Sequence, residues 1–371
     1  MEARTRIVHL IHSLESGGAE NVLLRTLPLL NDDEFEHVVI TLFRPGELSD
    51  EFERKRIKTI NIGLKHMLDL RSFRELVNQI HVLAPGLVIT YLFHADAIGR
   101  LYLRKRISTP VIPFLRTTYN FPRYLPARIF ERATKGLVAH YFANSEAVKD
   151  YYVRNIGASP GKFTVIPNGI DLLVFDRADG DRVVRELQLP RERFVISCVA
   201  NFAKNKGHAL LIEAFDRLSQ AHPEAWLVLV GTGEGLGNLQ RQTRSYASQH
   251  KILFLGRRKD VPDILAASDS FVFPTLFEGM PNAVLEAMAA GLPIVTTDIP
   301  ENRVLITDRV NGLLVEPAKA EAIQEALEDV FRDARLRSRI GKAARATVEQ
   351  RFSMPRVLQM WGEALREFAK P

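Results

Sequence analysis

The sequence has very little cysteine and no long apolar run. Its 371 residues include a single cysteine, Cys198, so an intrachain disulfide and a zinc site built of several cysteines are both excluded, and a reducing compartment is expected. No stretch approaches the roughly 20 apolar residues that span a bilayer, and the first apolar run, residues 7–11, is too short for a secretory signal. Hydrophobic residues make up 46% and charged residues 25%, which is typical of a folded chain. We expect a cytoplasmic or peripheral protein.

The basic residues are distributed unevenly. The net charge is +6, and residues 100–135 carry nine basic side chains against one acid, Glu131. Such a segment attracts an anionic partner, either lipid headgroups, a phosphorylated substrate or nucleic acid, but solvated helix faces would explain it equally well. Nucleic acid is not expected, because the excess is local and no nucleic-acid-reading module is evident.

Short apolar, β-branched runs alternate with helix-like segments along the whole chain. The expected strands are residues 7–11, 38–43, 87–90, 111–115, 138–142, 163–166, 194–199, 226–230, 252–255, 270–273, 293–296 and 313–315. The expected helices include residues 19–30, 73–83, 207–220, 261–267, 282–290, 320–331 and 354–368. This pattern predicts two consecutive doubly wound α/β domains with a boundary near residues 171–192. Ligands of such sheets bind at the carboxyl ends of the strands, so we expect a cleft between the two domains.

The most informative segment is Phe273–Pro293. Pro281 suits the first turn of a helix, Gly291 suits the position after its end, and Pro293 prevents continuation. The helix therefore presents its N-terminus, where amide groups favour an anion, directly after a strand.

Two carboxylates flank this helix N-terminus. Glu278 lies in the loop before the helix and Glu286 lies eight residues later, on the helix itself. They can address different parts of an extended ligand such as a nucleotide sugar, although a dipole partner and a surface acid would be the plain structural explanation. A carboxylate in so apolar a helix favours the first explanation.

The string E-G-x-P-N-x-x-x-E-A-M-A-x-G-x-P at 278–293 resembles the donor-site signature of the retaining glycosyltransferases of family 4, which have the GT-B fold. Further segments agree in order and spacing along nearly the whole chain. They are Gly17–Glu20, Asn144–Ala147, Val165–Asp171, Lys206–His208, Val230–Gly233, Leu255–Arg257 and Ala266–Asp269.

The resemblance implies roles for matching residues of the second half. Glu278 would contact the donor sugar, Glu286 the ribose, and Lys206 the departing diphosphate, while residues 256–258 would hold the nucleobase through their backbone. The full set of donor contacts that it implies is Gly17, Gly18, Asn201, Lys204, Gly231, Gly233, Gly256, Arg257, Arg258, Gly279, Met280, Pro281, Asn282 and Glu286, beside the catalytic residues His94, Glu278 and Lys206.

In the first half, a Gly17-Gly18 pair between strand and helix permits positive φ and close approach of an anion, although a tight turn needs glycine anyway. The resemblance places His94 beside the reacting sugar, whereas helix capping would be its plain explanation. Glu20 and Arg116 are expected on the acceptor, and a surface role for Arg116 is equally compatible with the sequence.

The resemblance also implies the domains. Residues 1–172 would bind the acceptor, residues 173–350 would bind the donor, and a terminal helix within 351–371 would pack back on the first domain, although core packing against the second would give the same pattern.

One departure concerns the phosphate site. The family usually has an arginine shortly after the strand that precedes the K-G element, but residues 199–206 contain none, and Lys204 can replace it only as a point charge. Asp179-Gly180-Asp181 matches a metal-binding D-x-D pattern but lies in the linker, where Asp-Gly is an ordinary turn. We therefore expect no metal site and no cofactor.

The resulting prediction is a metal-independent, retaining transfer of a sugar from a nucleotide diphosphate sugar, with UDP preferred over GDP on family frequency, to a hydroxyl of a sugar or lipid-linked acceptor. Bacterial surface polysaccharide or glycolipid assembly at the inner face of the cytoplasmic membrane would suit it, with residues 100–135 on an anionic membrane. Two alternatives stay open: a NAD(P)-dependent oxidoreductase using Gly231–Leu236, although Arg257 stands where an acid is wanted, and a non-catalytic nucleotide-sugar-binding scaffold.

Overall fold

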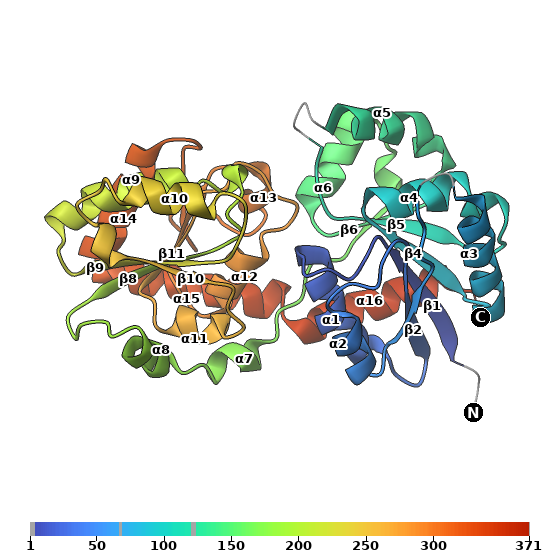
Figure 1. Ribbon diagram of the computed structural model, residues 1–371, viewed down its shortest axis with the longest axis horizontal. Coiled ribbons are helices and arrows are strands. Elements are labelled where there is room, and N and C mark those ends of the chain that lie inside the picture. Colours follow the sequence, from blue (N-terminus) through green and yellow to red (C-terminus); the bar gives the residue numbers. More distant parts are fainter. Residues whose placement is uncertain (1–3, 67–68, 120–123, 371) are drawn as a thin grey trace. The chain divides into compact units, whose positions relative to one another are not determined.

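The computed structural model describes residues 4–66, 69–119 and 124–370. The contacts between residues divide the chain into two compact units. Unit 1 comprises Met1–Gly169 and Pro355–Pro371, and unit 2 comprises Ile170–Met354. Figure 1 shows a twisted sheet with helices on both faces in each of them. Each unit is described by itself below.

Unit 1 is built on a sheet of seven parallel strands in the order β3-β2-β1-β4-β5-β6-β7. The strands are β1 (Thr5–Ile11), β2 (Phe35–Thr41), β3 (Lys58–Asn61), β4 (Leu87–Tyr91), β5 (Val111–Leu115), β6 (Tyr141–Ala143) and β7 (Phe163–Val165). The central strands are buried, as expected of apolar strands covered on both faces. Strand β3 was not expected from the sequence, because it is a short edge strand whose two end residues are exposed.

Helices cover both faces of this sheet. They are α1 (Gly18–Leu30), α2 (Ser49–Arg54), α3 (Leu70–Leu83), α4 (Leu92–Leu101), α5 (Leu125–Thr134), α6 (Glu146–Tyr151) and the chain-terminal α16 (Met354–Phe368). Apolar side chains of α1 and α16 form one core with β1, β4 and β5. Those of α3 and α4 form a second core on the other face. The face that a helix buries follows from its 3.6-residue periodicity.

The terminal helix α16 packs on unit 1. The Trp361 ring lies edge-on to the rings of Phe114 and Phe142, with centroids 5.3 and 6.0 Å apart. Beyond the helix, the amide of Lys370 donates to the carbonyl of Gly86 at 3.1 Å. The apolar periodicity of the segment is therefore explained by the core of unit 1.

Unit 2 contains a sheet of six parallel strands in the order β10-β9-β8-β11-β12-β13. The strands are β8 (Phe194–Val199), β9 (Ala225–Val230), β10 (Ile252–Gly256), β11 (Ser270–Phe273), β12 (Ile294–Thr297) and β13 (Leu313–Val315). The helices are α7 (Leu172–Asp176), α8 (Gly180–Glu186), α9 (His208–Ala221), α10 (Leu236–Thr243), α11 (Val261–Ala266), α12 (Asn282–Ala289), α13 (Pro300–Arg303), α14 (Ala320–Arg332) and α15 (Ala334–Arg351).

These two units confirm the predicted fold class of two doubly wound, parallel-sheet α/β domains. The described helices include none that is both long enough and apolar enough to cross a bilayer.

Candidate active site

In unit 2, two loops meet at the carboxyl ends of the neighbouring strands β8 and β11. The amide of Leu276, after β11, donates to the carbonyl of Asn205, after β8, at 2.8 Å. The buried hydroxyl of Thr275 lies 3.3 Å from the same carbonyl and 3.3 Å from Oε1 of Glu278. These bonds bring the K-G element and the carboxylate signature together although they are far apart in sequence.

The loops place Lys206 directly against Glu278. The Lys206 ammonium forms an ion pair with Oε1 of Glu278, and the two side chains are 16% and 14% exposed. The same ammonium lies 5.5 Å from the centroid of the Phe273 ring. The two predicted catalytic residues of unit 2 thus form one partly desolvated pair, in which a charge-assisted contact is stronger than on an open surface.

Gly207 allows this approach. Its φ of +72° lies in the left-handed region, and a Cβ at this position would collide with the carbonyl oxygen of Pro274. A glycine is therefore needed between Lys206 and α9 for the loops to touch.

Helix α12 begins at Asn282, and the expectation that Pro281 belongs to its first turn is wrong. Pro281 is the N-cap residue, with an extended backbone, and its own side chain makes no capping hydrogen bond. The expected helix stop is confirmed, because Gly291 follows the helix with a φ of +74°. Glu286 is half-buried on α12, among neighbours that are mostly buried and apolar. The N-terminus of α12, where the backbone amides are not bonded within the helix, comes shortly after Glu278, Gly279 and Met280.

The segment expected at the nucleobase follows β10. Gly256 ends the strand with a φ of +66°, and its carbonyl accepts from the amide of Gly231 at 2.8 Å. Arg257 is exposed. The guanidinium of Arg258 pairs with Glu186 at 2.9 Å and with Asp260 at 2.8 Å. The ion pairs of Arg258 hold this segment and leave its backbone as the part suited to a base.

The Gly231 loop packs on the segment after β8. A Cβ on Gly231 would collide with the carbonyl of Ala200, and one on Gly233 would lie 2.8 Å from the amide nitrogen of Phe202. These glycines therefore permit close backbone packing beside Asn201, which is exposed like Lys204. No finding supports the dinucleotide alternative for this loop.

In unit 1, polar side chains follow five strands at one edge of the sheet. They are His12 after β1, His94 after β4, Arg116 after β5, Asn144 after β6 and Asn168 after β7. Because the strands are parallel, their carboxyl ends share this edge. The structure thereby groups the predicted residues His94 and Arg116 with three that the sequence reasoning had not singled out as site residues.

The glycine pair before α1 does not use positive φ, which corrects that expectation. Gly17 is the N-cap residue with φ −143° and ψ 176°, and Gly18 is the first residue of α1. A Cβ on Gly17 would meet the carboxylate of Glu20 in the first turn. The two glycines therefore leave room for close contacts at the helix N-terminus and are not needed for an unusual backbone conformation.

Arg116 lies in a polar but water-poor surrounding. Its Nη2 donates to Oδ1 of Asn168 at 2.8 Å, and its guanidinium lies 5.2 Å from the centroid of the Phe114 ring. Burial lowers the pKa of Arg116 to about 10, against the raising influence of Tyr91 and Glu20. Burial likewise raises the pKa of Glu20, which is 8% exposed. Arg116 is therefore half-buried and hydrogen-bonded rather than fully solvated, which favours the functional alternative over an ordinary surface arginine.

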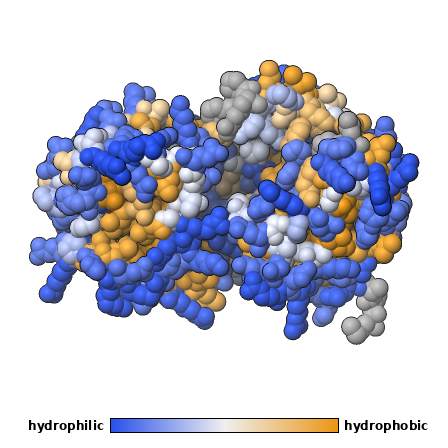
Figure 2. All heavy atoms as spheres, viewed as in Figure 1, coloured by the Kyte–Doolittle hydropathy of each residue, from blue (hydrophilic) through white to orange (hydrophobic). Residues whose placement is uncertain are grey.

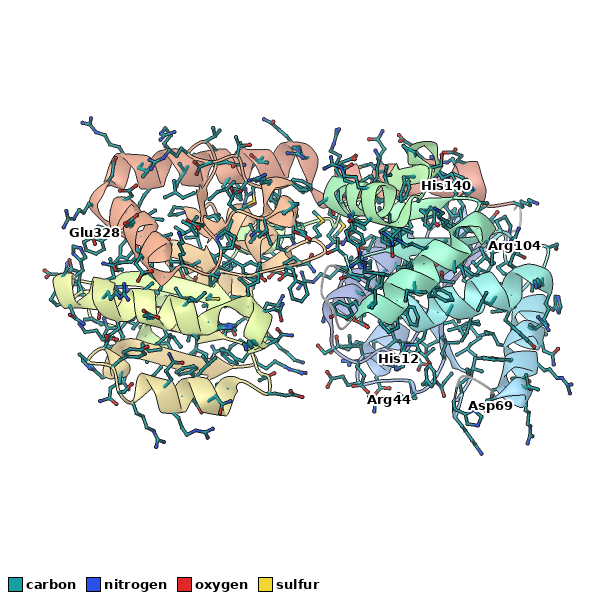
Figure 3. The ribbon with its side chains drawn as sticks, turned by 90° about the horizontal axis from the view of Figure 1, so that it is seen from above. His12, Arg44, Asp69, Arg104, His140 and Glu328 are labelled. Carbon is teal, nitrogen blue, oxygen red and sulfur yellow. The ribbon has the colours of Figure 1, made fainter. Side chains whose placement is uncertain are left out.

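His94 follows an unusual turn. Leu92, its neighbour in the first turn of α4, has a φ of +66°, and the His94 ring lies 4.9 Å from that of His12, centroid to centroid. Burial lowers the pKa of both histidines, and the proximity of His94 and Arg44 lowers that of His12 further. Figure 3 labels His12 and Arg44 close together in unit 1. Two neutral imidazoles are thus expected at this edge at neutral pH.

The basic segment 100–135 is not one charged surface, which corrects the expectation drawn from its composition. Arg100 is 4% exposed, and its Nη1 pairs with the fully buried Glu131 at 2.5 Å. Arg104 and Lys105 are exposed. Of the aromatic side chains in this segment, Tyr119 is buried and Phe121 lies outside the described residues.

Asp179 of the D-x-D pattern caps α8, because its side chain accepts from the amide of Arg182 at 2.9 Å. Asp179 is therefore a helix cap rather than part of the ordinary turn that was expected.

His12 and Asn168 could have been found from the sequence. His12 follows a predicted strand directly, as Arg116 does, and Asn168 lies in the loop that follows another, as His94 does. The Pro167-Asn168-Gly169 segment reads as a turn when taken alone, so only the strand-end rule distinguishes it.

Comparisons with known proteins agree along the chain. The sequence model described as "Glycosyltransferase Family 4" matches residues 16–173, and that described as "Glycosyl transferases group 1" matches residues 180–347. The chain is 27% identical over 353 residues, 89% of each chain, to the UDP-Gal:alpha-D-GlcNAc-diphosphoundecaprenol alpha-1,3-galactosyltransferase of Escherichia coli. It is 26% identical over 344 residues, 88% of this chain and 90% of the relative, to an N-acetylgalactosamine-N,N'-diacetylbacillosaminyl-diphospho-undecaprenol 4-alpha-N-acetylgalactosaminyltransferase of Campylobacter jejuni.

Among solved structures, HepE of Anabaena in complex with UDP superimposes with a TM-score of 0.86 over 98% of this chain and 100% of its own, at 22% identity. This likeness shows the fold. Taken with the two family matches, which together span both units, it leads to one assignment: the chain belongs to the family-4 glycosyltransferases and has the GT-B fold.

Proposed function

We propose that this glycosyltransferase moves a sugar from a nucleotide diphosphate sugar, held at the strand-end loops of unit 2, to an acceptor hydroxyl presented by the polar edge of unit 1. The observation that carries the proposal is the Lys206–Glu278 pair in the loop that leads into the N-terminus of α12. A cation, a carboxylate and a helix N-terminus within one loop cluster match a diphosphate joined to a sugar.

The proposed roles follow from charge. Lys206 and the first amides of α12 stabilise the negative charge that develops on the leaving diphosphate, and Glu278 accepts hydroxyl protons of the sugar in hydrogen bonds. Glu286 accepts from the ribose. Lys206 supplies the cation that a divalent metal supplies in other enzymes, so transfer is proposed to be metal-independent.

Retention of anomeric configuration is part of the proposal. Glu278 is assigned to the hydroxyl groups of the donor sugar and is therefore not proposed as the nucleophile. Attack on the same face, with the acceptor proton passing to the leaving phosphate, needs no protein nucleophile. The neutral imidazole of His94 does not oppose positive charge that develops on the sugar as the bond to the diphosphate breaks.

UDP is the proposed nucleotide. The Escherichia coli relative carries UDP-Gal in its name, and the HepE structure contains UDP. Both named relatives act on diphosphoundecaprenol-linked acceptors. We therefore propose a lipid-linked acceptor, bacterial polysaccharide or glycolipid assembly, and a cytoplasmic protein working at the inner face of the membrane.

The test is a donor screen followed by product analysis. UDP-, GDP- and ADP-sugars are compared by thermal shift, and a productive donor is then incubated with a polyprenyl-diphosphate-linked sugar in the presence of EDTA. The proposal predicts stabilisation by a UDP-sugar, acceptor-dependent UDP release that survives EDTA, and an α-linked product from an α-linked donor by NMR. A β-linked product contradicts retention, and loss of activity in EDTA contradicts metal independence.

A Glu278→Ala variant separates catalysis from the scaffold alternative. The proposal predicts that this variant fails to support glycan assembly in cells, whereas a binding scaffold would continue to support it.

A further inference from the structure

Helix α5 of unit 1 exposes its apolar face and buries a charged residue on the opposite face. Leu125 and Ile129, four residues apart on one face, are 52% and 59% exposed, and Pro126 and Ala133 on the same face are also exposed. The opposite face carries Glu131, which is fully buried. A helix on a water-soluble surface normally shows the reverse arrangement, with its apolar stripe inward. Figure 2 shows apolar atoms at the outer surface of unit 1, where Figure 1 draws α5.

The inner face of α5 is held by polar contacts. Nη1 of Arg100, from α4, lies 2.5 Å from Oε2 of Glu131 and 3.1 Å from Oγ1 of Thr134. The Phe93 and Phe130 rings add a contact with centroids 5.2 Å apart. An ion pair thus replaces much of the apolar packing that would otherwise turn the leucine and isoleucine inward. The outward face is therefore a built feature of the fold and does not arise from a loosely attached helix.

Cations outnumber acids around α5. From residue 97 to residue 145 the sequence contains a single acid, Glu131, and its charge is buried against Arg100. Arg132 on α5 and Arg104 and Lys105 after α4 are exposed. The neighbouring α6 carries the exposed acids Glu146 and Asp150, and each is paired with a cation, Lys149 and Arg154. An apolar stripe beside this excess of cations complements an anionic lipid surface.

The size of the apolar stripe argues against a protein partner. Leu125 and Ile129 are its two large side chains, whereas a stable protein interface takes about 800 Å² from each partner. Reversible insertion into a lipid interface needs only a few apolar side chains together with cations. Helix α5 also follows the carboxyl end of β5, so it shares the edge that carries Arg116.

We infer that α5 is the element that docks this protein on an anionic bilayer, with Leu125 and Ile129 inserted among the headgroups and the cations paired with lipid phosphates. The inference rests on the proposed use of a lipid-linked acceptor. The docking element is thus one helix rather than the whole basic segment 100–135. Its apolar stripe contributes as much to membrane binding as its charge does.

Vesicle co-sedimentation of the full chain tests the inference. The wild type is compared with Leu125→Ser/Ile129→Ser on phosphatidylcholine vesicles with and without phosphatidylglycerol. A matched control, Leu29→Ser/Val82→Ser, removes two side chains that are 54% and 79% exposed elsewhere on unit 1. We expect the α5 variant to bind anionic vesicles about tenfold or more weakly, and the control to bind as the wild type does. Charge reversal at Arg104 and Lys105 is expected to weaken binding further and to remove the preference for anionic lipid.

Several outcomes would overturn the inference: wild type that does not bind anionic vesicles, an α5 variant that binds as well as the wild type, or a dimer of the wild type that the variant loses. Melting temperature and UDP affinity are measured for every variant. Unchanged UDP affinity with lost vesicle binding supports the inference. Absence of UDP binding in all of them, the wild type included, contradicts the proposed function whatever the vesicles show.

Discussion

The ammonium of Lys206 is paired with the carboxylate of Glu278 across 72 residues of sequence. Both side chains are largely shielded from water, and each is proposed to bind a different part of the donor. We therefore expect a diphosphate to compete with Glu278 for Lys206 and to release the carboxylate for the sugar. Binding of the nucleotide and ordering of the sugar site are linked in this way.

Exchanging the two charges tests this linkage. Lys206→Glu/Glu278→Lys keeps an ion pair but sets a carboxylate where the diphosphate is expected. We expect the swapped protein to be more stable than either single variant, because the ion pair is restored. We expect loss of UDP binding, because the leaving group then meets a negative charge. Urea denaturation and calorimetric titration measure the two effects. A swapped variant that binds UDP normally would contradict the proposed role of Lys206.

Gly207 should tolerate no side chain. Gly207→Ala introduces a Cβ against the Pro274 carbonyl at a φ of +72°, and we expect about 2–4 kcal/mol of destabilisation. Gly237→Ala is the matched control, because its Cβ would be no nearer than 3.8 Å to the end of Arg241 within α10. It should stabilise the protein by about 0.5–1 kcal/mol. Equal effects in urea denaturation would show that the loops do not meet as described.

His208 should make the protein sensitive to acid. Neither of its ring nitrogens has a hydrogen-bond partner among the described residues, and burial, assisted by the charge of Lys206, lowers the pKa of His208 from 6.5 to about 4. In this window the unfolded chain binds the proton and the folded protein does not, so stability falls as the pH falls from about 6.5 to 4.

Replacing His208 should remove this part of the pH dependence. Between pH 7 and pH 5 the group accounts for about 2 kcal/mol of lost stability, which His208→Leu should abolish. The exposed His81 provides the control substitution, His81→Leu, which should leave the dependence as it is. The measurement is the free energy of unfolding in urea at the two pH values, and an unchanged slope in His208→Leu would contradict the assignment.

The buried pair below α5 makes a further prediction. Glu131→Gln leaves the guanidinium of Arg100 buried without its close counter-charge, and we expect about 3–5 kcal/mol of destabilisation. Arg100→Met/Glu131→Leu removes both charges and should be far less harmful than the single substitution. Chemical denaturation of the three proteins measures this. A double variant less stable than Glu131→Gln would show that the pair itself stabilises the fold.

The sequence was most informative where burial is complete. Central strands such as β1 and β8 are apolar on both faces, so their residues could be recognised without tertiary information. Strand β3 was missed because it lies at an edge with exposed ends, and α15 because many of its side chains are arginine and other polar residues that face water. The sequence pattern predicts a strand or helix best where both of its faces, or one whole face, are buried in the core.

The candidate site could be predicted as a set of residues but not as a geometry. The carboxylate signature predicted Glu278, the family resemblance implied Lys206 and His94, and the strand-end rule pointed to Arg116. The contact of Lys206 with Glu278 depends on β8 and β11 being neighbours in the sheet, which chain order does not reveal. The burial of Arg100 against Glu131 depends likewise on helix packing, so composition alone overestimated the charged surface.

The central claim is that the Lys206 loop of unit 2 binds a nucleotide diphosphate, and the most direct measurement is calorimetric titration of UDP into the wild type and into Lys206→Ala. The account predicts a saturable 1:1 isotherm for the wild type and an affinity at least about 100-fold weaker for the variant, about 2.7 kcal/mol. Wild type that does not bind UDP, or a variant that binds it equally well, would contradict the account.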